Sequence, residues 1–222
     1  MERARPEGTP RRERADAVRN RRAILLAAHR LICENGVDQV SMNDIAAEAG
    51  VGKGTLFRRF GDREGLIHAL FEQLTADWEP GALARLSDPA TPPLQRVLGF
   101  ITELFDHVTV PGRPLLRAMG GHPRAERLEH YRLWLGHLTK AVAEARPDLT
   151  EGEAAFMAHV VLNTPRAQFV ELLEAEAGLS SDDIRAGIVA STYATLSGPR
   201  LPSELLPPVR ACAKGAGGGP PQ

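Results

Sequence analysis

Residues 41–60, SMNDIAAEAGVGKGTLFRRF, decide the fold of this chain. Ser41 is suited to cap a short helix, because Asp44 follows three residues later and completes a capping box. Gly50 suits the left-handed position that ends such a helix. A second helical segment follows in the second half of the stretch. The sequence therefore predicts two short helices joined by a tight turn.

The predicted second helix, residues 53–60, sorts its side chains by direction. When Leu56 and Phe60 face inward, a rotation of about 100° per residue turns three side chains outward and leaves three on the flanks. Small outward residues permit close approach to a duplex, and cations pair with phosphates, as in helices that enter the DNA major groove. The alternative is an ordinary helical hairpin with solvated charges. The outward residues are Gly54, Thr55 and Arg58, and the flanking residues are Lys53, Phe57 and Arg59.

Three segments of the N-terminal third carry a resemblance to a known family. They are RAIL at residues 22–25, ENG at residues 34–36 and DIAAEAGVGKGTLFRRFGDREGL at residues 44–66. In motif order and spacing, residues 19–74 resemble the N-terminal domain of TetR-type transcriptional regulators. The resemblance implies an all-α dimer in which a helix-turn-helix domain binds DNA and a helical domain regulates that binding. Beyond residue 80 the similarity is only architectural.

Eleven residues of the N-terminal region are expected to contact DNA. Arg21 and Arg22 lie in the first turns of the preceding helix, and they either contact phosphates or are merely exposed to solvent. In the resembled family the first turn of the next helix touches a phosphate, and Arg63 occupies that position here. A tyrosine commonly stands where Phe57 is, so one phosphate hydrogen bond of the family is missing. The eleven residues are Arg21, Arg22, Ser41, Asn43, Lys53, Gly54, Thr55, Phe57, Arg58, Arg59 and Arg63.

The composition is that of an ordinary soluble globular protein, with 43% hydrophobic and 25% charged residues among 222. No apolar run approaches the ~18 residues of a membrane span and no signal peptide is recognised, so a cytoplasmic protein without a membrane partner is expected. Cys33 and Cys212 give neither a disulfide framework nor a metal site, and no cofactor is predicted. Residues 1–65 carry 13 Lys and Arg against 10 Asp and Glu, a net charge of +3, whereas residues 66–222 carry 14 against 18, a net charge of −4. The excess positive charge therefore lies with the expected DNA reader.

Composition and periodicity divide the chain into four parts. The arm at the N-terminus carries five arginines, and it either reaches a minor groove or is a plain solvated tail. Within the third part, residues 66–78 are expected to form a connecting helix, followed by a Pro- and Gly-bearing joint at residues 80–93. The parts are a disordered arm at 1–17, a helix-turn-helix DNA-binding domain at 18–65, a helical regulatory and dimerisation domain at 66–197 and a disordered tail at 198–222.

Helical periodicity continues through residues 94–197 without an alternating strand pattern, so the chain is predicted to be all-α. The first helix of this region is expected to end at Pro111 and the glycine after it. A capping box beginning at Thr150 opens a long apolar helix. Pro165 removes the amide that would bond Val161, and it is expected to kink that helix.

Small residues on the last helix indicate a dimer interface. They form a stripe that lets another helix approach closely, and the resembled family packs its last two long helices against their symmetry mates as a four-helix bundle. The alternative is that the stripe packs against a helix of the same chain. The residues expected in the interface are Phe169, Leu173, Ile184, Gly187, Ala190 and Ala194.

Bulky residues on inward-looking stripes of different helices are candidates for an effector pocket. Trp134 and His159 can present a hydrogen-bond donor inside an apolar wall, which would orient a ligand. The alternative is that these stripes are packed core. The candidates are Phe100, Leu104, Met119, Trp134, Phe156 and His159.

These features predict a transcription regulator, namely a dimeric repressor released from a palindromic operator in double-stranded DNA by an unidentified small-molecule effector. A regulator without an effector and an enzyme are the alternatives. His107, His130, His137 and His159 are the residues that acid–base or metal chemistry would use. His130 and His137 lie seven residues apart without a ligand at the third or fourth position, and the sequence has no nucleophile elbow, P-loop or dinucleotide motif. The sequence therefore favours a regulator over an enzyme.

Overall fold

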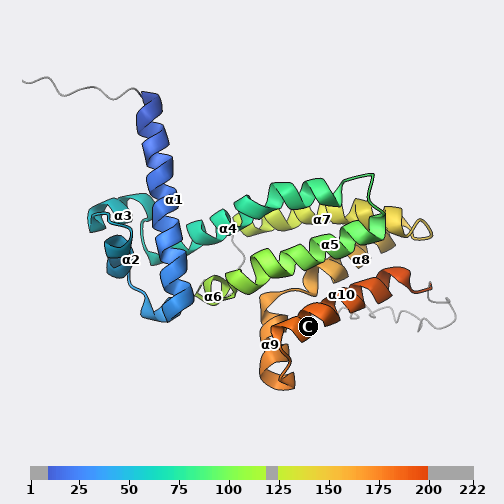
Figure 1. Ribbon diagram of the computed structural model, residues 1–222. Helices are drawn as coiled ribbons and strands as arrows, with labels where there is room; N and C mark the ends of the chain where they lie inside the picture. Colours follow the sequence, from blue (N-terminus) through green and yellow to red (C-terminus); the bar gives the residue numbers. More distant parts are fainter. Residues whose placement is uncertain (1–9, 119–124, 200–222) are drawn as a thin grey trace, which may run out of the picture.

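A computed structural model describes residues 10–118 and 125–199, and all regular structure among them is helical, as predicted (Figure 1). Three helices and one 3₁₀ turn form an N-terminal domain at one end of the molecule. These elements are α1 (Pro10–Asn35), η1 (Val37–Gln39), α2 (Met42–Glu48) and α3 (Lys53–Phe60).

Helix α4 (Arg63–Leu86) leads from this domain into a second, larger helical domain (Figure 1). There it packs against α5 and α7, while α8 packs against α7 and α10 packs against α5. The remaining elements are α5 (Pro93–Leu104), the π turn η2 (Phe105–Thr109), α6 (Val110–Ala118), α7 (Ala125–Ala145), α8 (Glu151–Asn163), α9 (Ala167–Ala177) and α10 (Ser181–Ser197).

Each helix of the N-terminal domain gives one apolar face to the core. Ile24 and Ala28 of α1 are fully buried, as is Leu56 of α3, and Ile45 of α2 is nearly so. Leu66, in the first turn of α4, is buried in the same core. Burying a Leu or Ile side chain stabilises a domain by about 1.5–3 kcal/mol. These contacts fix α3 by one side and leave its other side to solvent.

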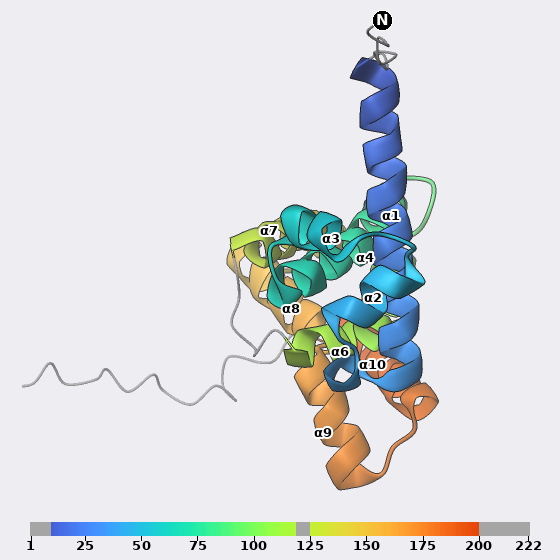
Figure 2. The same cartoon turned by 90° about the vertical axis from the view of Figure 1, so that its left-hand side faces the viewer.

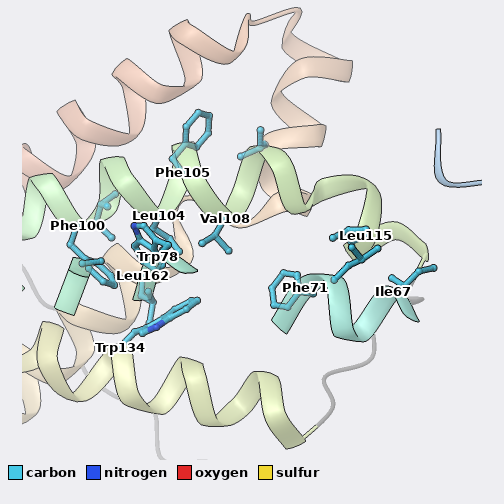
Figure 3. Close-up of a cluster of buried hydrophobic side chains, with 14 of the residues drawn as sticks. Ile67, Phe71, Trp78, Phe100, Leu104, Phe105, Val108, Leu115, Trp134 and Leu162 are labelled. Atoms are coloured by element: carbon cyan, nitrogen blue, oxygen red, sulfur yellow. The ribbon is translucent and has the colours of Figure 1, made fainter. Parts of the chain in front are cut away.

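Three aromatic rings lie at the centre of the second domain (Figure 3). Trp78 of α4 lies 5.4 Å from Phe100 of α5 and 5.5 Å from Trp134 of α7, measured between ring centroids. The ring centroids of Phe100 and Trp134 are 6.5 Å apart. The Trp78–Phe100 pair is tilted and the other two pairs are edge-to-face, which are arrangements that aromatic rings prefer. The three rings therefore tie α4, α5 and α7 together.

Capping boxes start α2, α8 and α10. In each box the hydroxyl of the cap accepts the amide proton of the third helical residue, whose carboxylate accepts the amide proton of the cap. An N-cap of this kind is worth ~1 kcal/mol. The predicted helix starts at Ser41 and Thr150 are confirmed. The boxes pair Ser41 with Asp44, Thr150 with Glu153 and Ser180 with Asp183.

Helix α1 begins at Pro10, so the prediction of a disordered arm over residues 1–17 is wrong from residue 10 onward. Residues 11–17 are mostly Arg, Glu and Ala, which favour a helix, and proline is well tolerated in a first turn. Residues 1–9, and the expected tail from residue 200 onward, lie outside the described residues.

Helix α4 is longer than predicted. The sequence places its end near Pro80, but the helix continues to Leu86 with the proline inside it. Pro80 has no amide proton for the carbonyl of Ala76, which costs about 3 kcal/mol in a helix interior. Trp78, Ala82 and Leu86 are buried one above another on the same face, and this burial outweighs the cost.

Arg96 fixes the short connection between α4 and α5. Its guanidinium is buried and donates hydrogen bonds to the carbonyls of Leu86 and Thr91, both at 3.0 Å. It also pairs with Glu144 of α7. The joint expected over residues 80–93 is therefore wrong: this segment is a helix end followed by a pinned connection.

The helix that begins with α5 does not end at Pro111. A π turn, η2, follows α5 directly, and Pro111 lies in the first turn of α6. The amide of Val110 donates to the carbonyl of Phe105, five residues earlier. This wide turn directly precedes Pro111, which has no amide proton to give, and the chain continues as helix.

Pro165 breaks the long helix predicted after residue 150, where only a kink is expected. Helix α8 ends two residues before Pro165, and α9 starts two residues after it. Pro165 cannot donate to the carbonyl of Val161, which accepts instead from the amide and the hydroxyl of Thr164 at 3.3 Å and 2.7 Å.

Candidate nucleic-acid interface

Helices α2 and α3 form the helix-turn-helix predicted for residues 41–60. Figure 2 looks onto this end of the molecule, with α3 in front of α4. Gly50 takes the left-handed conformation in the turn, with φ +64°, which glycine adopts without steric cost. The next amide, of Val51, donates to the carbonyl of Ala46 at 2.9 Å, and the Val51 side chain packs against the core. These contacts end α2 and set the start of α3.

Helix α3 buries Leu56 and Phe60, as predicted, and presents a basic face to solvent. The helix carries three cations and no acidic residue. A Cβ atom added at Gly54 would meet nothing within 4 Å, so the surface over this residue is open. The exposed side of α3 consists of Lys53, Gly54, Phe57 and Arg58, while Thr55 and Arg59 are half-buried.

Two cations lie over aromatic rings at the flanks of α3. The guanidinium of Arg21, on α1, lies 5.1 Å from the centre of the Phe60 ring. The ammonium of Lys53 lies 5.7 Å from the centre of the Phe57 ring. Contacts of this kind stabilise the position of a cation by about 0.5–1 kcal/mol at an exposed ring such as Phe57, and by up to about 2 kcal/mol at a buried ring such as Phe60. They place positive charge on both sides of the exposed face.

The start of α2 uses Ser41 mainly as a cap. Its hydroxyl donates to the Asp44 carboxylate at 2.6 Å and accepts the Asp44 amide proton at 3.2 Å. The hydrogen bonds from the Ser41 side chain and backbone lower the pKa of Asp44. Asn43, one residue before Asp44, is exposed.

The structure gives two predicted phosphate ligands other partners. The guanidinium of Arg63 donates to the carbonyl of Val37, which ties the first turn of α4 to η1. Arg22, exposed on α1, lies 4.0 Å from the carboxylate of Asp77 on α4. The hydrogen bond to Val37 uses one of the five donors of Arg63 and leaves the others for a phosphate, whereas Arg22 is held only by a weak surface pair.

The expected effector-pocket residues are divided between the packed core and the surface. Phe100, Leu104 and Trp134 are buried in the aromatic core described above, as their alternative predicts. Phe156 is 70% exposed and His159 is also exposed, so their assignment to an inward-looking stripe is wrong. Helix α8 has apolar residues on more than one side, and periodicity alone does not say which side faces the core. Met119 lies outside the described residues.

The expected dimer residues divide into two groups. Ile184 is buried and Leu173 is half-buried within their own chain. The others form an exposed set on α9 and α10, and a Cβ atom at Gly187 would meet nothing within 4 Å. Tyr193 of α10, which the prediction omits, is 54% exposed beside them. The exposed set consists of Phe169, Gly187, Ala190 and Ala194.

Sequence reasoning misses a polar seam between α4 and α7. His130 of α7 lies between the carboxylates of Glu72 and Glu79 on α4. Trp134 of α7 donates its indole proton to Glu79 at 2.6 Å. The spacing of seven residues places Glu72 and Glu79 on one face of α4, but it does not identify His130 as the residue that they contact.

Two further searches concern only the part of the chain that the structure describes. No group of three His, Cys, Asp or Glu side chains there is arranged to hold a metal ion. None of the helices in that part is both long and apolar enough to span a membrane.

The N-terminal domain matches known regulators in sequence. Residues 24–70 match the family model described as bacterial regulatory proteins, tetR family. An HTH-type transcriptional regulator of Staphylococcus aureus (strain bovine RF122 / ET3-1) is 51% identical over 60 residues, which are 27% of this chain and 32% of that protein. The chain thus spans about a third of the length of the curated relatives it matches.

Over most of the chain, the fold is similar to that of solved regulators. A regulator of the TetR/AcrR family from Thermobifida fusca YX-ER1 is 20% identical with a TM-score of 0.60, over 82% of this chain and 98% of that one. AibR in complex with isovaleryl coenzyme A and operator DNA is 21% identical with a TM-score of 0.56, over 78% of this chain and 97% of that one. Residues 24–70 thus match the tetR family of bacterial regulatory proteins in sequence, and the helices of the chain share the fold of solved regulators of that family.

Proposed function

We propose that the protein is a sequence-specific transcriptional repressor that binds operator DNA as a homodimer and is released by a small-molecule effector. The outer face of α3 carries the proposal. Lys53, Gly54 and Arg58 are exposed there without an acidic neighbour on the helix, while Leu56 and Phe60 fix its other side. A rigid helix with a bare, basic face is what the major groove accepts.

In this proposal the residues of α3 have different tasks. Gly54 lets the helix backbone approach the duplex because it has no side chain to separate them. Arg58, at the centre of the exposed face, donates to a base edge, and arginine pairs bidentately with guanine. Lys53 and Arg59, at the flanks, contact phosphates, which add affinity without reading sequence.

A homodimer is proposed because one α3 reads too few base pairs for a specific site. The exposed small residues of α10, Gly187, Ala190 and Ala194, support close packing against the same helix of a second copy. Two copies related by a two-fold axis would present two α3 helices to a palindromic operator. The distance between those helices then selects the half-site spacing.

Effector release is proposed by analogy of fold. AibR, whose fold is similar, is solved with isovaleryl coenzyme A and operator DNA. An effector acts only through its differential affinity for the DNA-binding and the released arrangements, typically ~1–3 kcal/mol. We place the effector site in the second domain.

A regulator without an effector is the second candidate, and one observation favours it. Trp78, Phe100 and Trp134 fill the centre of the second domain by packing against one another. Phe100 and Trp134, which are expected to line a pocket, therefore pack against other core side chains.

Selection of genomic fragments on the purified protein tests the proposal. A DNA-binding repressor is expected to enrich fragments that share a palindromic motif, whereas enrichment without a shared motif contradicts sequence-specific binding. A panel of metabolites is then tested for displacement of the protein from the selected fragment. If no metabolite displaces it, the second candidate is favoured.

A further inference from the structure

The polar seam between α4 and α7 is centred on one imidazole. Nδ1 of His130 lies 2.7 Å from Oε2 of Glu79, and Nε2 lies 3.2 Å from Oε2 of Glu72. The two glutamates are seven residues apart on α4, which is two helical turns, so they stand on one face. The side chains of His130 and Glu79 are 20% and 14% exposed. The ring is thus gripped from both sides by carboxylates of another helix.

This geometry requires a charged imidazole. An ionised carboxylate only accepts hydrogen bonds, and a neutral imidazole has one donor and one acceptor nitrogen. Only the imidazolium has a proton for each glutamate. Burial lowers the pKa of His130, but the hydrogen bonds that it donates to Glu72 and Glu79 outweigh burial, so that the pKa is raised above its ordinary value.

Loss of the proton would place a nitrogen lone pair of His130 against a carboxylate oxygen. A neutral ring would turn a lone pair toward one of the two carboxylates, at 2.7 Å from Glu79 or 3.2 Å from Glu72. The seam would then hold two carboxylates without a cation. Glu72 would lose the most, because its Oε1 is already buried without a hydrogen-bond partner among the described residues and its Oε2 would lose the proton of His130. The Glu72 and Glu79 side chains are 37% and 14% exposed, and holding two partly buried carboxylates together without a cation is costly, so the two helices would separate at this point.

Other charged and titratable groups lie around His130. On α4, His68 lies one turn before Glu72. On α5, Glu103 accepts from the indole of Trp78 at 3.2 Å and from Arg85 at 2.8 Å. On α7 itself, Glu129 is exposed. Between the described residues, α7 also contacts α4 and its end through the Trp134–Glu79 bond and a contact of 3.0 Å between Ser87 and His137.

We propose that His130 is a proton-dependent latch that holds α4 against α7, and that loss of its proton frees α4 to shift relative to the second domain. Helix α4 is the element that leads from the DNA-binding domain into the second domain. A change in its packing therefore reaches the DNA-binding helices directly. Operator binding then depends on pH, and this last step rests on the proposed function.

The chain contains a reporter for the latch. Its only two tryptophans are Trp78 and Trp134, and both line this seam. The ring centroids of His130 and Trp134 are 6.0 Å apart. An imidazolium quenches indole emission more strongly than a neutral imidazole. Tryptophan fluorescence between pH 5.5 and 9.5 is therefore expected to rise in a single step with its midpoint above about 6.5, the ordinary pKa of histidine.

Two variants of His130 represent the two states of the latch. His130→Arg keeps two donors and a charge at every pH tested, and His130→Gln has no charge. Both are expected to abolish the fluorescence step. His107→Gln, which removes an exposed histidine on η2, is the matched control and is expected to leave the step unchanged. A step that persists in His130→Gln, or a wild-type midpoint below 6.5, overturns the latch.

Operator affinity measured over the same pH range tests the second half of the proposal. The wild-type protein is expected to pass from the affinity of His130→Arg at pH 6 to that of His130→Gln at pH 9, a change of about fivefold or more. Equal affinities of the two variants overturn the regulatory role. If no variant binds any selected fragment, the proposed function fails, while the fluorescence step still decides whether the latch exists.

Discussion

At the scale of single residues, the proposed function gives base reading and phosphate binding to different residues of α3. Arg58 is exposed at its centre and Arg59 is half-buried at its flank. We expect Arg58→Ala to relax base preference at one position by about 1–3 kcal/mol. We expect Arg59→Ala to weaken all duplexes evenly and to lower the salt slope by about 1. Each variant is the control for the other.

The measurement is a titration of both variants on operator and scrambled duplexes at several salt concentrations. Circular dichroism verifies that the helices are intact. If both variants bind both duplexes like the wild type, α3 is not the reading helix.

Phe57 gives a second prediction at this scale. The ring is 38% exposed and has no hydroxyl. We expect Phe57→Tyr to tighten binding to any duplex by about 1 kcal/mol, or roughly fivefold, because the new hydroxyl donates to a phosphate. Phe57→Leu, which also lacks the hydroxyl, is the control. Unchanged affinity of Phe57→Tyr would show that position 57 lies away from the backbone of the duplex.

Single residues also show where sequence reasoning succeeds and where it stops. The inward direction of Leu56 and Phe60 follows from a single short amphipathic helix and is confirmed. The direction of Phe156 is wrong because α8 packs mainly against α7 and leaves one apolar side to solvent. A helical pattern marks an apolar side chain without saying which neighbour covers it. The contacts of His130 depend on the register between α4 and α7, which no local pattern contains.

At the scale of elements, the junction of α3 and α4 depends on one close approach. A Cβ atom at Gly65, in the first turn of α4, would lie 2.0 Å from the carbonyl oxygen of Phe60. We expect Gly65→Ala to lower the free energy of unfolding by about 1–3 kcal/mol, because the backbone must move to relieve the clash. Urea denaturation followed by circular dichroism measures the change.

Gly152 of α8 is the matched control for this prediction. It is exposed, and a Cβ atom there would meet nothing within 4 Å. Gly152→Ala is expected to raise stability by about 0.4–1 kcal/mol, as alanine does at a compatible helical position. Similar effects of the two substitutions would contradict the close approach at Gly65.

Prolines explain why the helices were easier to predict than their ends. Capping boxes at Ser41 and Thr150 mark helix starts through local hydrogen bonds, and these are confirmed. Pro80 and Pro111 are local signals to stop, but α4 and the α5–η2–α6 run continue through them. Burial of Trp78, Ala82 and Leu86 against distant parts of the chain decides the first case. Tertiary packing of this kind cannot be read from a local breaker.

At the scale of the whole molecule, the exposed stripe of α10 predicts how two copies meet. We expect Gly187→Arg to give a monomer and to weaken operator binding by about 10²-fold or more, because each half-site would bind alone. Arginine also favours a helix over glycine, so the monomer is expected to stay folded. Analytical ultracentrifugation and operator titration give the two readouts.

Gly99 of α5 provides the control for the dimer. Like Gly187, it is an exposed helical glycine over which a Cβ atom would meet nothing within 4 Å. Gly99→Arg is expected to remain dimeric with unchanged affinity. A dimeric Gly187→Arg protein would move the interface to another surface.

The unbroken run of α4 through Pro80 makes this helix a lever. Its 24 residues span about 36 Å, at 1.5 Å each. A tilt of about five degrees at one end therefore displaces the other by about 3 Å, close to the 3.4 Å rise of one base pair. Arg96 holds the C-terminal end of α4 by its hydrogen bond to the carbonyl of Leu86, so the helix would pivot about that end, in the larger domain. In the proposed function, a tilt of a few degrees in the larger domain is therefore enough to displace α3 by about one base pair relative to the major groove.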